Sequence, residues 1–486
     1  MKLSISLATK KWVLFTIIST VIFSACQKQA EQPNEQPQAE LSTAANQNGH
    51  GHLQQTKTFS SDVVIKWLNL DLDLLRTPLP AGTAVQGGER ILAYSGIALY
   101  EAVVNGMPAY QSLVGQLTAF PAMPTTEPGK AYHWAAAANA ALAQETRYLF
   151  DTASTSTNLT IKQQRLDKIN ALEKTLQDAY ATEVDAATLQ RSISFGKDVA
   201  SRVSAWADAD GYKLQGAAYT PVSDPNKPWL WVPTAPPPAL PINPYVKDNR
   251  RLLVAGSDNG ATVDPFPPFS TTPGSEFYEM ANDVYTKSLS PTAVQKNLAL
   301  YFRDSNDPGF PGYYGGSGHY IAILPQIISK SGVALDIAAL AFAKSGIAVN
   351  DAFIVGFIRK YEFNLLRPIT YLRNFAGHPS WSPLFATPNH PEFPSAHSFH
   401  AGGFLTGLAD VFGENFEFTD NTYANMSTSL GTLQALTFHS FTELKKAIGD
   451  SRVYGGIHYA PSCEKGIQLG EKVGQNVLNT LKFLKE

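Results

Sequence analysis

Cysteine and net charge are both scarce in this sequence, and each scarcity excludes something. Cys26 and Cys463 are the only cysteines, so at most one disulfide is possible, and none if Cys26 is modified. The 38 basic and 41 acidic residues almost cancel, which leaves a formal net charge of −3. A chain without a basic excess lacks the electrostatic footprint of a nucleic-acid-binding protein. We therefore expect any anion site to be built locally from a few cations.

Long apolar segments are missing as well, except at the N-terminus. No later stretch has 18 or more uncharged apolar residues, so we expect the body to be soluble. Lys10 and Lys11 precede an apolar run, residues 12–25, which is short for a transmembrane helix and ends directly before Cys26. This pattern resembles a bacterial lipoprotein signal peptide over residues 1–26, with Cys26 lipidated and the protein anchored in the cell envelope. A plain secretory signal is the alternative.

Composition divides the rest of the chain into three parts. Residues 27–58 are rich in Gln, Glu, Pro and Asn, which predicts a disordered tether. Residues 59–275 show helical periodicity followed by a proline-rich loop, and residues 276–486 return to helical periodicity. Strand signals are scarce. The sequence therefore predicts an all-α fold of two packed helical bundles with long Pro-rich loops.

The spacing of apolar residues also predicts individual helices. A Gly/Pro/Tyr-rich connection at residues 304–318 separates two groups of them. The expected helices are 63–74, 90–104, 131–149, 159–182, 189–208, 276–303, 320–331, 333–366, 398–411, 432–450 and 462–485.

The first of three informative segments contains Lys360, Arg367 and Pro368. Seven residues separate the two cations, about two helical turns, so a helix continuing to Arg367 would point both the same way. Pro368 disfavours helix at Arg367, where we expect the helix to end. A guanidinium can bind two oxygens of a tetrahedral oxyanion, with the ammonium beside it. The alternative is that both cations only complement a helix dipole.

The second segment is Pro394-Ser395-Ala396-His397. Ser395 is a good N-cap, and the free N–H groups of a helix N-terminus bind anions. The Ser395 hydroxyl could add a donor, and His397 could act as a general acid or base. An ordinary capped helix with surface histidines is the alternative.

The third segment holds Arg452 and His458 on either side of Gly455-Gly456. The glycine pair breaks the helix, so the chain can fold both side chains toward one point. A second arginine and a histidine could then supply charge and a nucleophile or ligand. The alternative is a Gly-Gly turn with a capping arginine.

In order along the chain, the three segments read Lys-x6-Arg-Pro, Pro-Ser-x-His and Ser-Arg-x5-His. This series is similar to the motifs of the vanadium haloperoxidase and type-2 phosphatidic acid phosphatase superfamily. Residues 367–373, 381–384 and 391–395 further resemble bacterial haloperoxidase-like envelope proteins. The resemblance places an oxyanion site in the C-terminal bundle.

The resemblance also implies a role for each motif residue toward bound vanadate, or phosphate in the same site. His458 would bind axially, as the vanadium ligand of a haloperoxidase or as the nucleophile of a phosphatase that forms a phosphohistidine. His397 would be the acid or base on the opposite side. The oxyanion would be held by Lys360, Arg367, Ser395, the N–H of Ala396 and Arg452.

Two positions depart from the family pattern. Ala396 replaces the family's glycine, which adds a methyl group beside the oxyanion. Ser462 stands where many members have an aspartate that orients the last histidine, so we expect that carboxylate to be missing unless Glu464 or a backbone carbonyl replaces it. Such a loss would harm a nucleophile more than a ligand, which favours the haloperoxidase branch. His400, one helical turn after His397, could tune the pKa of His397 or help to desolvate a halide.

Three functions therefore stay open. The first is a vanadate-dependent haloperoxidase acting on hydrogen peroxide and halide; the second is a phosphomonoesterase acting on a phosphate ester. The third is a non-catalytic envelope lipoprotein that binds an oxyanion. By analogy the protein could form a homodimer, with no nucleic acid partner and with membrane contact through the lipid alone. Candidate residues at the entrance of the site are His319, His378 and His390.

Overall fold

The computed structural model describes residues 54–76, 87–152, 159–212, 218–234, 240–263, 266–304, 312–315 and 317–486. The expected signal peptide with Cys26, and the expected tether up to residue 53, lie outside these ranges. Residues 51–486 cluster as one unit. The end of the expected tether is ordered: η1 (Thr56–Thr58) packs on the fold, and the Thr56 hydroxyl donates to the Val103 carbonyl at 2.8 Å. Residues 54–58 therefore belong to the described fold and not to the expected tether.

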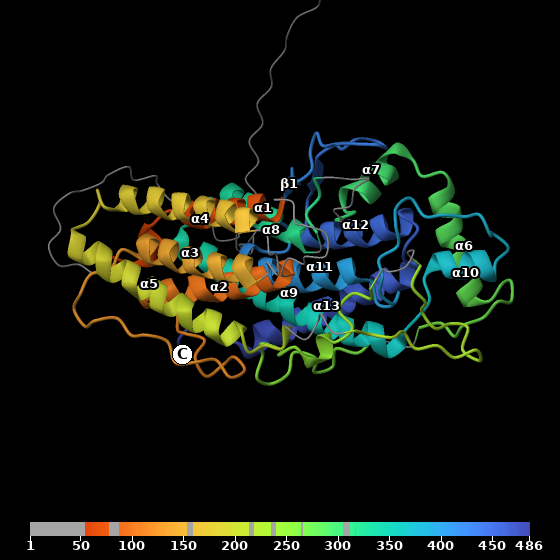
Figure 1. Cartoon of the computed structure of the whole chain (residues 1–486), viewed down its shortest axis with the longest axis horizontal. Coiled ribbons are helices and arrows are strands. Elements are labelled where there is room, and N and C mark those ends of the chain that lie inside the picture. Colours follow the sequence, from red (N-terminus) through yellow and green to blue (C-terminus); the bar gives the residue numbers. More distant parts are fainter. Residues whose placement is uncertain are drawn as a thin grey trace, which may run out of the picture. The chain divides into compact units, whose positions relative to one another are not determined.

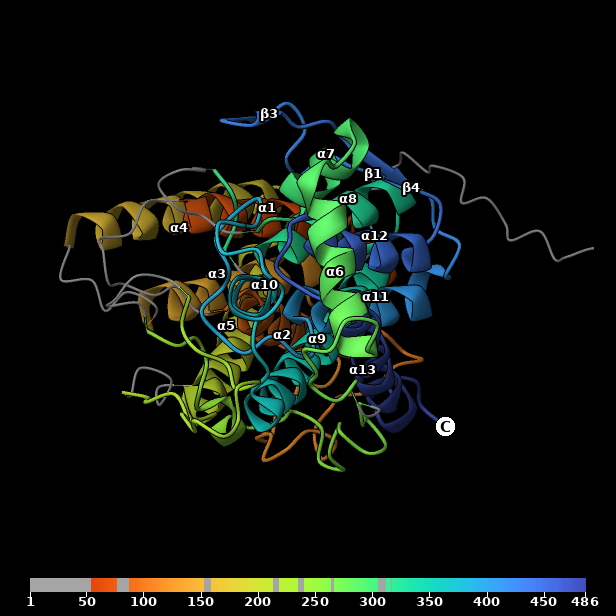
Figure 2. The ribbon, with the colours of Figure 1, turned by 90° about the vertical axis from the view of Figure 1, so that its right-hand side faces the viewer.

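Helices dominate the described residues, which confirms the all-α class (Figure 1). The first half contains α1 (Asp62–Arg76), α2 (Gly88–Val103), α3 (Trp134–Thr152), α4 (Leu159–Tyr180) and α5 (Ala186–Ala207). The second half contains α6 (Glu276–Leu289), α7 (Ala293–Tyr301), α8 (Gly318–Ser331), α9 (Leu335–Phe363), α10 (Pro368–Asn374), α11 (Ala396–Phe412), α12 (Phe441–Tyr454) and α13 (Ala460–Thr480). Figure 2 shows α6 crossing in front of this second group.

Two expected helices differ most from the observed bounds. The helix expected at 276–303 is divided into α6 and α7, because Thr292 starts a new helix with a capping box. The helix expected at 432–450 begins only at Phe441. The residues before it form short antiparallel ladders instead: β1 (Phe418–Asp420) pairs with β4 (Leu436–Phe438), and β2 (Ser427–Thr428) pairs with β3 (Gly431–Thr432).

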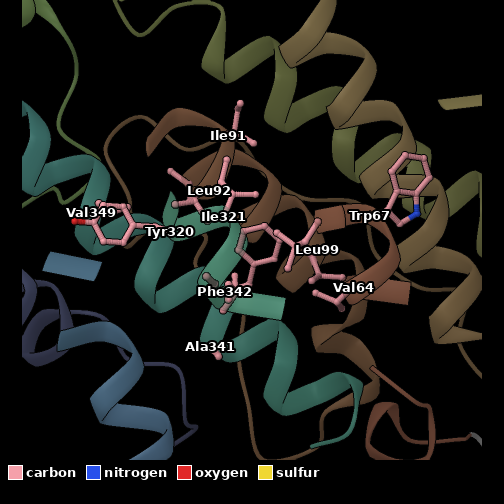
Figure 3. Packing of buried hydrophobic residues seen from close by; sticks show 14 of the residues in the cluster. Val64, Trp67, Ile91, Leu92, Leu99, Tyr320, Ile321, Ala341, Phe342 and Val349 are labelled. Carbon is pink, nitrogen blue, oxygen red and sulfur yellow. The ribbon is translucent and has the colours of Figure 1, made fainter. Parts of the chain in front are cut away.

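Helix α9 lies at the centre of the described fold, packed against α2, α11 and α13. Figure 3 shows Leu92 and Leu99 of α2 close to Phe342 of α9. The two backbones approach so closely that a Cβ on Gly96 would lie 2.7 Å from the Phe342 carbonyl oxygen. In the described part of the chain α9 is the one helix long and apolar enough to cross a membrane, but 89% of its apolar window is buried inside the protein. This burial identifies α9 as a core helix that joins the two groups.

Glycines bring α11 and α13 into equally close contact, and this contact positions the start of α11. A Cβ on Gly466 of α13 would lie 2.8 Å from the Ser395 carbonyl oxygen. One turn later, a Cβ on Gly470 would lie 2.8 Å from the Gly403 nitrogen. Backbone atoms cannot move aside as a flexible side chain can, so these positions require glycine.

We expect Gly470→Ala to destabilise the protein by about 1–3 kcal/mol, the usual cost of overpacking a closed interface. The exposed neighbour Gln475 on the same helix provides the control. Gln475→Ala should change stability by no more than about 0.5 kcal/mol. Chemical denaturation of both variants measures the difference, and equal stabilities would show that α11 and α13 can separate without cost.

Candidate active site

Lys360 and Arg367 come from two different helices, which corrects the prediction of a single continuous one. Helix α9 ends at Phe363, because Asn364 adopts the left-handed conformation with a φ of 45°. Arg367 is the N-cap of α10, which Pro368 begins. The turn between the helices, and not a shared helical face, directs both cations into the same buried region.

Both cations are fully buried and are held by backbone carbonyls. The Lys360 ammonium donates to the carbonyl oxygens of Pro391 and Glu392 at 3.0 and 2.9 Å. The Arg367 guanidinium donates from Nε to the carbonyl oxygen of His390 at 3.0 Å and from Nη1 to that of Ile457 at 2.9 Å. Carbonyl dipoles orient the cations without neutralising them, so most of their charge remains available to an anion.

The N-terminus of α11 adds hydrogen-bond donors. Ser395 is its N-cap, as expected, but the serine hydroxyl does not cap the helix. Among the described residues this buried hydroxyl oxygen has no hydrogen-bond partner. The first N–H groups of the helix, starting with Ala396, have no carbonyl within the helix to bind. A backbone bond from the Ser395 nitrogen to the Ser462 carbonyl oxygen, 3.1 Å, ties this end to α13.

Arg452 and His458 lie on either side of a glycine turn, close enough for the charge of Arg452 to help lower the pKa of His458. Helix α12 ends at Tyr454, and Gly456 takes a φ of 78°, which a residue with a side chain rarely adopts. His458 then lies next to Arg367, with His458 Nε2 3.1 Å from Arg367 Nη1. Arg452 donates to the carbonyl oxygen of Phe302 and lies over the Phe385 ring at 5.3 Å.

Glu392 supplies a carboxylate to His458 that the sequence analysis did not identify. The Glu392 Oε1 lies 2.8 Å from His458 Nδ1 and accepts the backbone N–H of Tyr459 at 3.0 Å. The prediction that Ser462 leaves His458 without a carboxylate was therefore wrong. Glu464, the substitute considered, is exposed and bonds to Gln468. The signal was available, since Glu392 is the acidic residue of residues 391–395, three positions before Ser395.

The contacts of His458 define its tautomer. Arginine can only donate, so the Nε2 that faces Arg367 must carry a lone pair and the proton is on Nδ1, facing Glu392. Burial, reinforced by the positive charges of Arg367 and Lys360, holds the pKa of His458 well below its ordinary value. His458 is therefore a neutral imidazole whose Nε2 lone pair is directed at the cations.

The site as a whole carries more positive than negative charge. Burial, with Arg367 adding repulsion, lowers the pKa of Lys360 well below its ordinary value. Burial also lowers the pKa of both Arg367 and Arg452 to about 10. Glu392 is a weak counter-charge, because burial raises its pKa to about 7. A buried cluster of this kind is stabilised by a bound anion.

His397 stands at the edge of this cluster with a carboxylate behind it. Its Nε2 lies 3.3 Å from Oδ2 of Asp304, a residue that the sequence analysis placed only in a loop. The His397 side chain is 18% exposed, whereas that of His458 is 2% exposed. Burial and the charge of Arg452 lower the pKa of His397 to about 4, although Asp304 opposes them. His397 is therefore a neutral base with some access to solvent.

The other candidate histidines occupy three kinds of position. His400 is buried, stacked on Phe353 at 5.7 Å, with Nδ1 3.4 Å from the Ser317 hydroxyl. His390 is buried beside Arg367, with Nδ1 3.0 Å from Nη2. His378 stacks on Tyr285 at 3.7 Å. His319 was expected at the entrance of the site, but it is buried, 1% exposed, between two carboxylates.

Comparison with known proteins agrees with this arrangement. The family described as the VCPO second helical-bundle domain matches residues 340–486, the range that contains every motif residue. The crystal structure of a bacterial vanadium-dependent iodoperoxidase is similar over 89% of this chain and 99% of that chain, with a TM-score of 0.75 and 24% identity. The chain has the vanadium haloperoxidase fold, and its C-terminal part belongs to that superfamily.

Two further structures share the vanadium haloperoxidase fold at lower identity. The holo form of a bacterial vanadium-dependent chloroperoxidase gives a TM-score of 0.58 and covers 87% of this chain and 93% of its own. The apo form gives 0.60 and covers 87% and 98%. Both are 15% identical to this chain. A search of curated proteins finds no match.

The residues of this haloperoxidase-like site fit a tetrahedral oxyanion such as vanadate. Three buried cations surround a region that also receives the α11 N-terminus, and the Ser395 hydroxyl oxygen and Arg452 Nε are buried without a partner among the described residues. Each of these groups is a donor that an oxyanion oxygen can satisfy. Imidazole nitrogens of both His458 and His390 face Arg367, at 3.1 and 3.0 Å, and His458 is the one of the two whose other nitrogen is held by a carboxylate, so its Nε2 would be the attachment point for the central atom.

Proposed function

We propose that this chain is a vanadate-dependent haloperoxidase that oxidises a halide with hydrogen peroxide. The observation that carries the proposal is the neutral His458, with its Nε2 lone pair turned toward buried cations that lack enough carboxylate. The similarity to a vanadium iodoperoxidase and a vanadium chloroperoxidase supports it. Which halide is used stays open.

In this proposal Lys360, Arg367 and Arg452 hold the oxygens of vanadate, joined by the Ser395 hydroxyl and the Ala396 N–H. Vanadate, when bound, would act as a Lewis acid that activates hydrogen peroxide toward a halide. Glu392 keeps the His458 proton on Nδ1, so that Nε2, which faces Arg367 Nη1 at 3.1 Å, keeps the lone pair that attachment would need.

His397 moves protons in this scheme. Its neutral state allows it to accept a proton from an incoming peroxide, and its partial exposure allows exchange with solvent. Ala396 in place of glycine fits this arrangement, because its side chain is only 7% exposed and packs in the core while its N–H stays at the helix start.

A phosphomonoesterase is the second candidate, and Glu392 is the observation that favours it. A carboxylate on Nδ1 is what a histidine nucleophile needs, so the expected disadvantage of this branch does not exist. In such an enzyme His458 Nε2 would attack phosphorus, a protonated His397 would give its proton to the leaving ester oxygen, and water would then hydrolyse the phosphohistidine. Because the pKa of His397 is lowered to about 4, this step would be favoured at acidic pH.

A paired assay on the purified protein separates the candidates. One arm supplies orthovanadate, hydrogen peroxide and iodide or bromide and follows halogenation of a dye. The other arm omits vanadate and follows hydrolysis of an aryl phosphate. We expect vanadate-dependent halogenation and little phosphate release. Phosphate release that vanadate inhibits would instead assign the phosphatase activity, and binding of vanadate without either reaction would leave the non-catalytic lipoprotein.

The location of the protein is a separate proposal that rests on the N-terminal sequence. We propose that Cys26 carries lipid and anchors the chain in the bacterial cell envelope. Labelling with radioactive palmitate should depend on this residue, and labelling that persists in Cys26→Ser would refute the anchor. Homodimer formation stays a prediction.

A further inference from the structure

A second buried cluster of charges lies behind His397 and belongs to none of the three motifs. We call it the His319 triad: Asp304 after α7, His319 in the first turn of α8 and Asp420 at the end of β1. His319 Nδ1 lies 3.0 Å from Asp304 Oδ1, and His319 Nε2 lies 2.8 Å from Asp420 Oδ2. The three residues are 7%, 1% and 0% exposed, respectively. An imidazole that donates to a carboxylate from both nitrogens is an imidazolium.

The surroundings of the triad keep this charge in place. Burial disfavours a charged His319, but the two carboxylates outweigh burial and raise its pKa to about 10. The Tyr423 hydroxyl donates to Asp304 Oδ1 at 3.0 Å, and the Thr422 backbone N–H donates to Asp420 Oδ1 at 2.9 Å. The rings of Tyr423 and Phe302 pack on His319 at 5.0 Å each. Polar and aromatic contacts therefore fix all three side chains.

Asp304 connects this triad to the candidate active site. Its Oδ1 is held by His319 and Tyr423, which leaves Oδ2 facing His397 Nε2 at 3.3 Å. His319 thus neutralises Asp304 and also sets the orientation of its carboxylate. An Asp304 without His319 would keep the Tyr423 hydroxyl and the attraction of Arg452 but would lose the imidazolium that fixes Oδ1, so its carboxylate could rotate.

We propose that His319 and Asp420 are positioning residues for His397, acting through the carboxylate that Asp304 presents to His397 Nε2. The contact is a close approach of charge to a ring nitrogen and not a well-formed hydrogen bond, because His397 Nε2 is buried 3.3 Å from Asp304 Oδ2 without a hydrogen-bond partner among the described residues. The negative carboxylate favours the His397 proton on Nε2, which leaves the Nδ1 lone pair for proton transfer. The role in turnover rests on the proposed haloperoxidase function; the effect on the His397 tautomer does not. Neither residue touches the oxyanion site, so neither is catalytic itself.

The test reads the His397 tautomer by nuclear magnetic resonance of the protein labelled with ¹⁵N-histidine. The spectrum of His397→Ala identifies the ring signals of His397. His319→Gln keeps a polar group of similar size but removes the charge, and Asp420→Asn removes the outer carboxylate. The matched control is His439→Gln, which breaks a His–carboxylate pair of the same kind on the surface, where His439 Nδ1 lies 2.7 Å from Glu417 Oε2.

We expect wild-type His397 to be a single tautomer with the proton on Nε2, and His319→Gln to contain both tautomers. With vanadate and peroxide, kcat for halide oxidation should fall about tenfold in His319→Gln, with KM nearly unchanged. This fall is smaller than the loss of rate expected when an acid–base group itself is removed. Asp420→Asn should show the same changes to a smaller degree, and His439→Gln none. If His397 keeps a single tautomer in both triad variants, the proposal is wrong.

Failure of the proposed function is distinguishable from failure of this inference. The tautomer is measured without vanadate and without turnover, so it reports on the triad alone. If the wild type oxidises no halide but His397 changes from one tautomer to a mixture of both in His319→Gln, the positioning role is supported and the haloperoxidase function is refuted.

Discussion

His458→Ala should abolish vanadate-dependent halide oxidation, with a fall in kcat/KM of about 10³-fold or more. Losses of this size are typical when a group that acts on the reacting atoms is removed. His458 is the neutral imidazole whose Nε2 faces the cations, and Glu392 holds its other nitrogen. Alanine would keep the charge of the site but remove the point of attachment. Vanadate should still bind weakly, through the cations alone.

Isothermal titration with orthovanadate, together with the halogenation assay, measures both parts of this prediction. His439→Ala is the control, because His439 is an exposed histidine that also pairs with a glutamate. The control should retain wild-type affinity and turnover. Undiminished halide oxidation in His458→Ala would exclude His458 as the vanadate ligand. If the wild type instead hydrolyses phosphate esters and His458→Ala does not, His458 is the nucleophile of a phosphatase.

Arg367→Lys should lower the affinity for vanadate about 10²–10³-fold, although the substitution keeps the positive charge. Removal of one preorganised donor from an oxyanion site has effects of this size. One planar guanidinium makes three contacts: Nε donates to the carbonyl oxygen of His390, and Nη1 donates to that of Ile457 and also faces His458 Nε2. An ammonium cannot reproduce this fork, so the loops that carry His390 and His458 would lose their common anchor.

Arg202→Lys is the matched control for this loss. Arg202 forms a fork to the Asp198 carboxylate at 3.0 and 3.2 Å, but it lies on the surface of α5 and is 40% exposed. Its replacement should leave vanadate affinity unchanged and should alter stability by no more than about 1 kcal/mol. Titration with phosphate should reproduce the order of affinities in all variants. Equal affinities of wild type and Arg367→Lys would show that charge alone holds the anion.

Much of the fold was predictable because local rules and tertiary structure agree. Alanine-rich amphipathic segments formed helices near their expected bounds, and the glycine pair after Arg452 ended α12 as predicted. The expectation failed where the tertiary structure overrides periodicity. Residues 432–438 have helical spacing, but Thr432 pairs with Ser427 and residues 436–438 pair with residues 418–420 as short strands. The left-handed Asn364 likewise ended α9 one turn before Arg367.

The sequence by itself determined which chemistry this protein can hold: two arginines, a lysine, a serine at a helix start and two histidines, in an order that matches one superfamily. Only the tertiary structure decided how these groups are charged and oriented. Glu392 reaches His458 across 66 positions, and Asp304 reaches His397 from a loop before α8. Neither contact can be read from local spacing, because Glu392, His458 and Asp304 lie in loops that only the tertiary structure brings to their partners. The charge state of a buried histidine depends on such long-range neighbours, and spacing along the chain does not encode them.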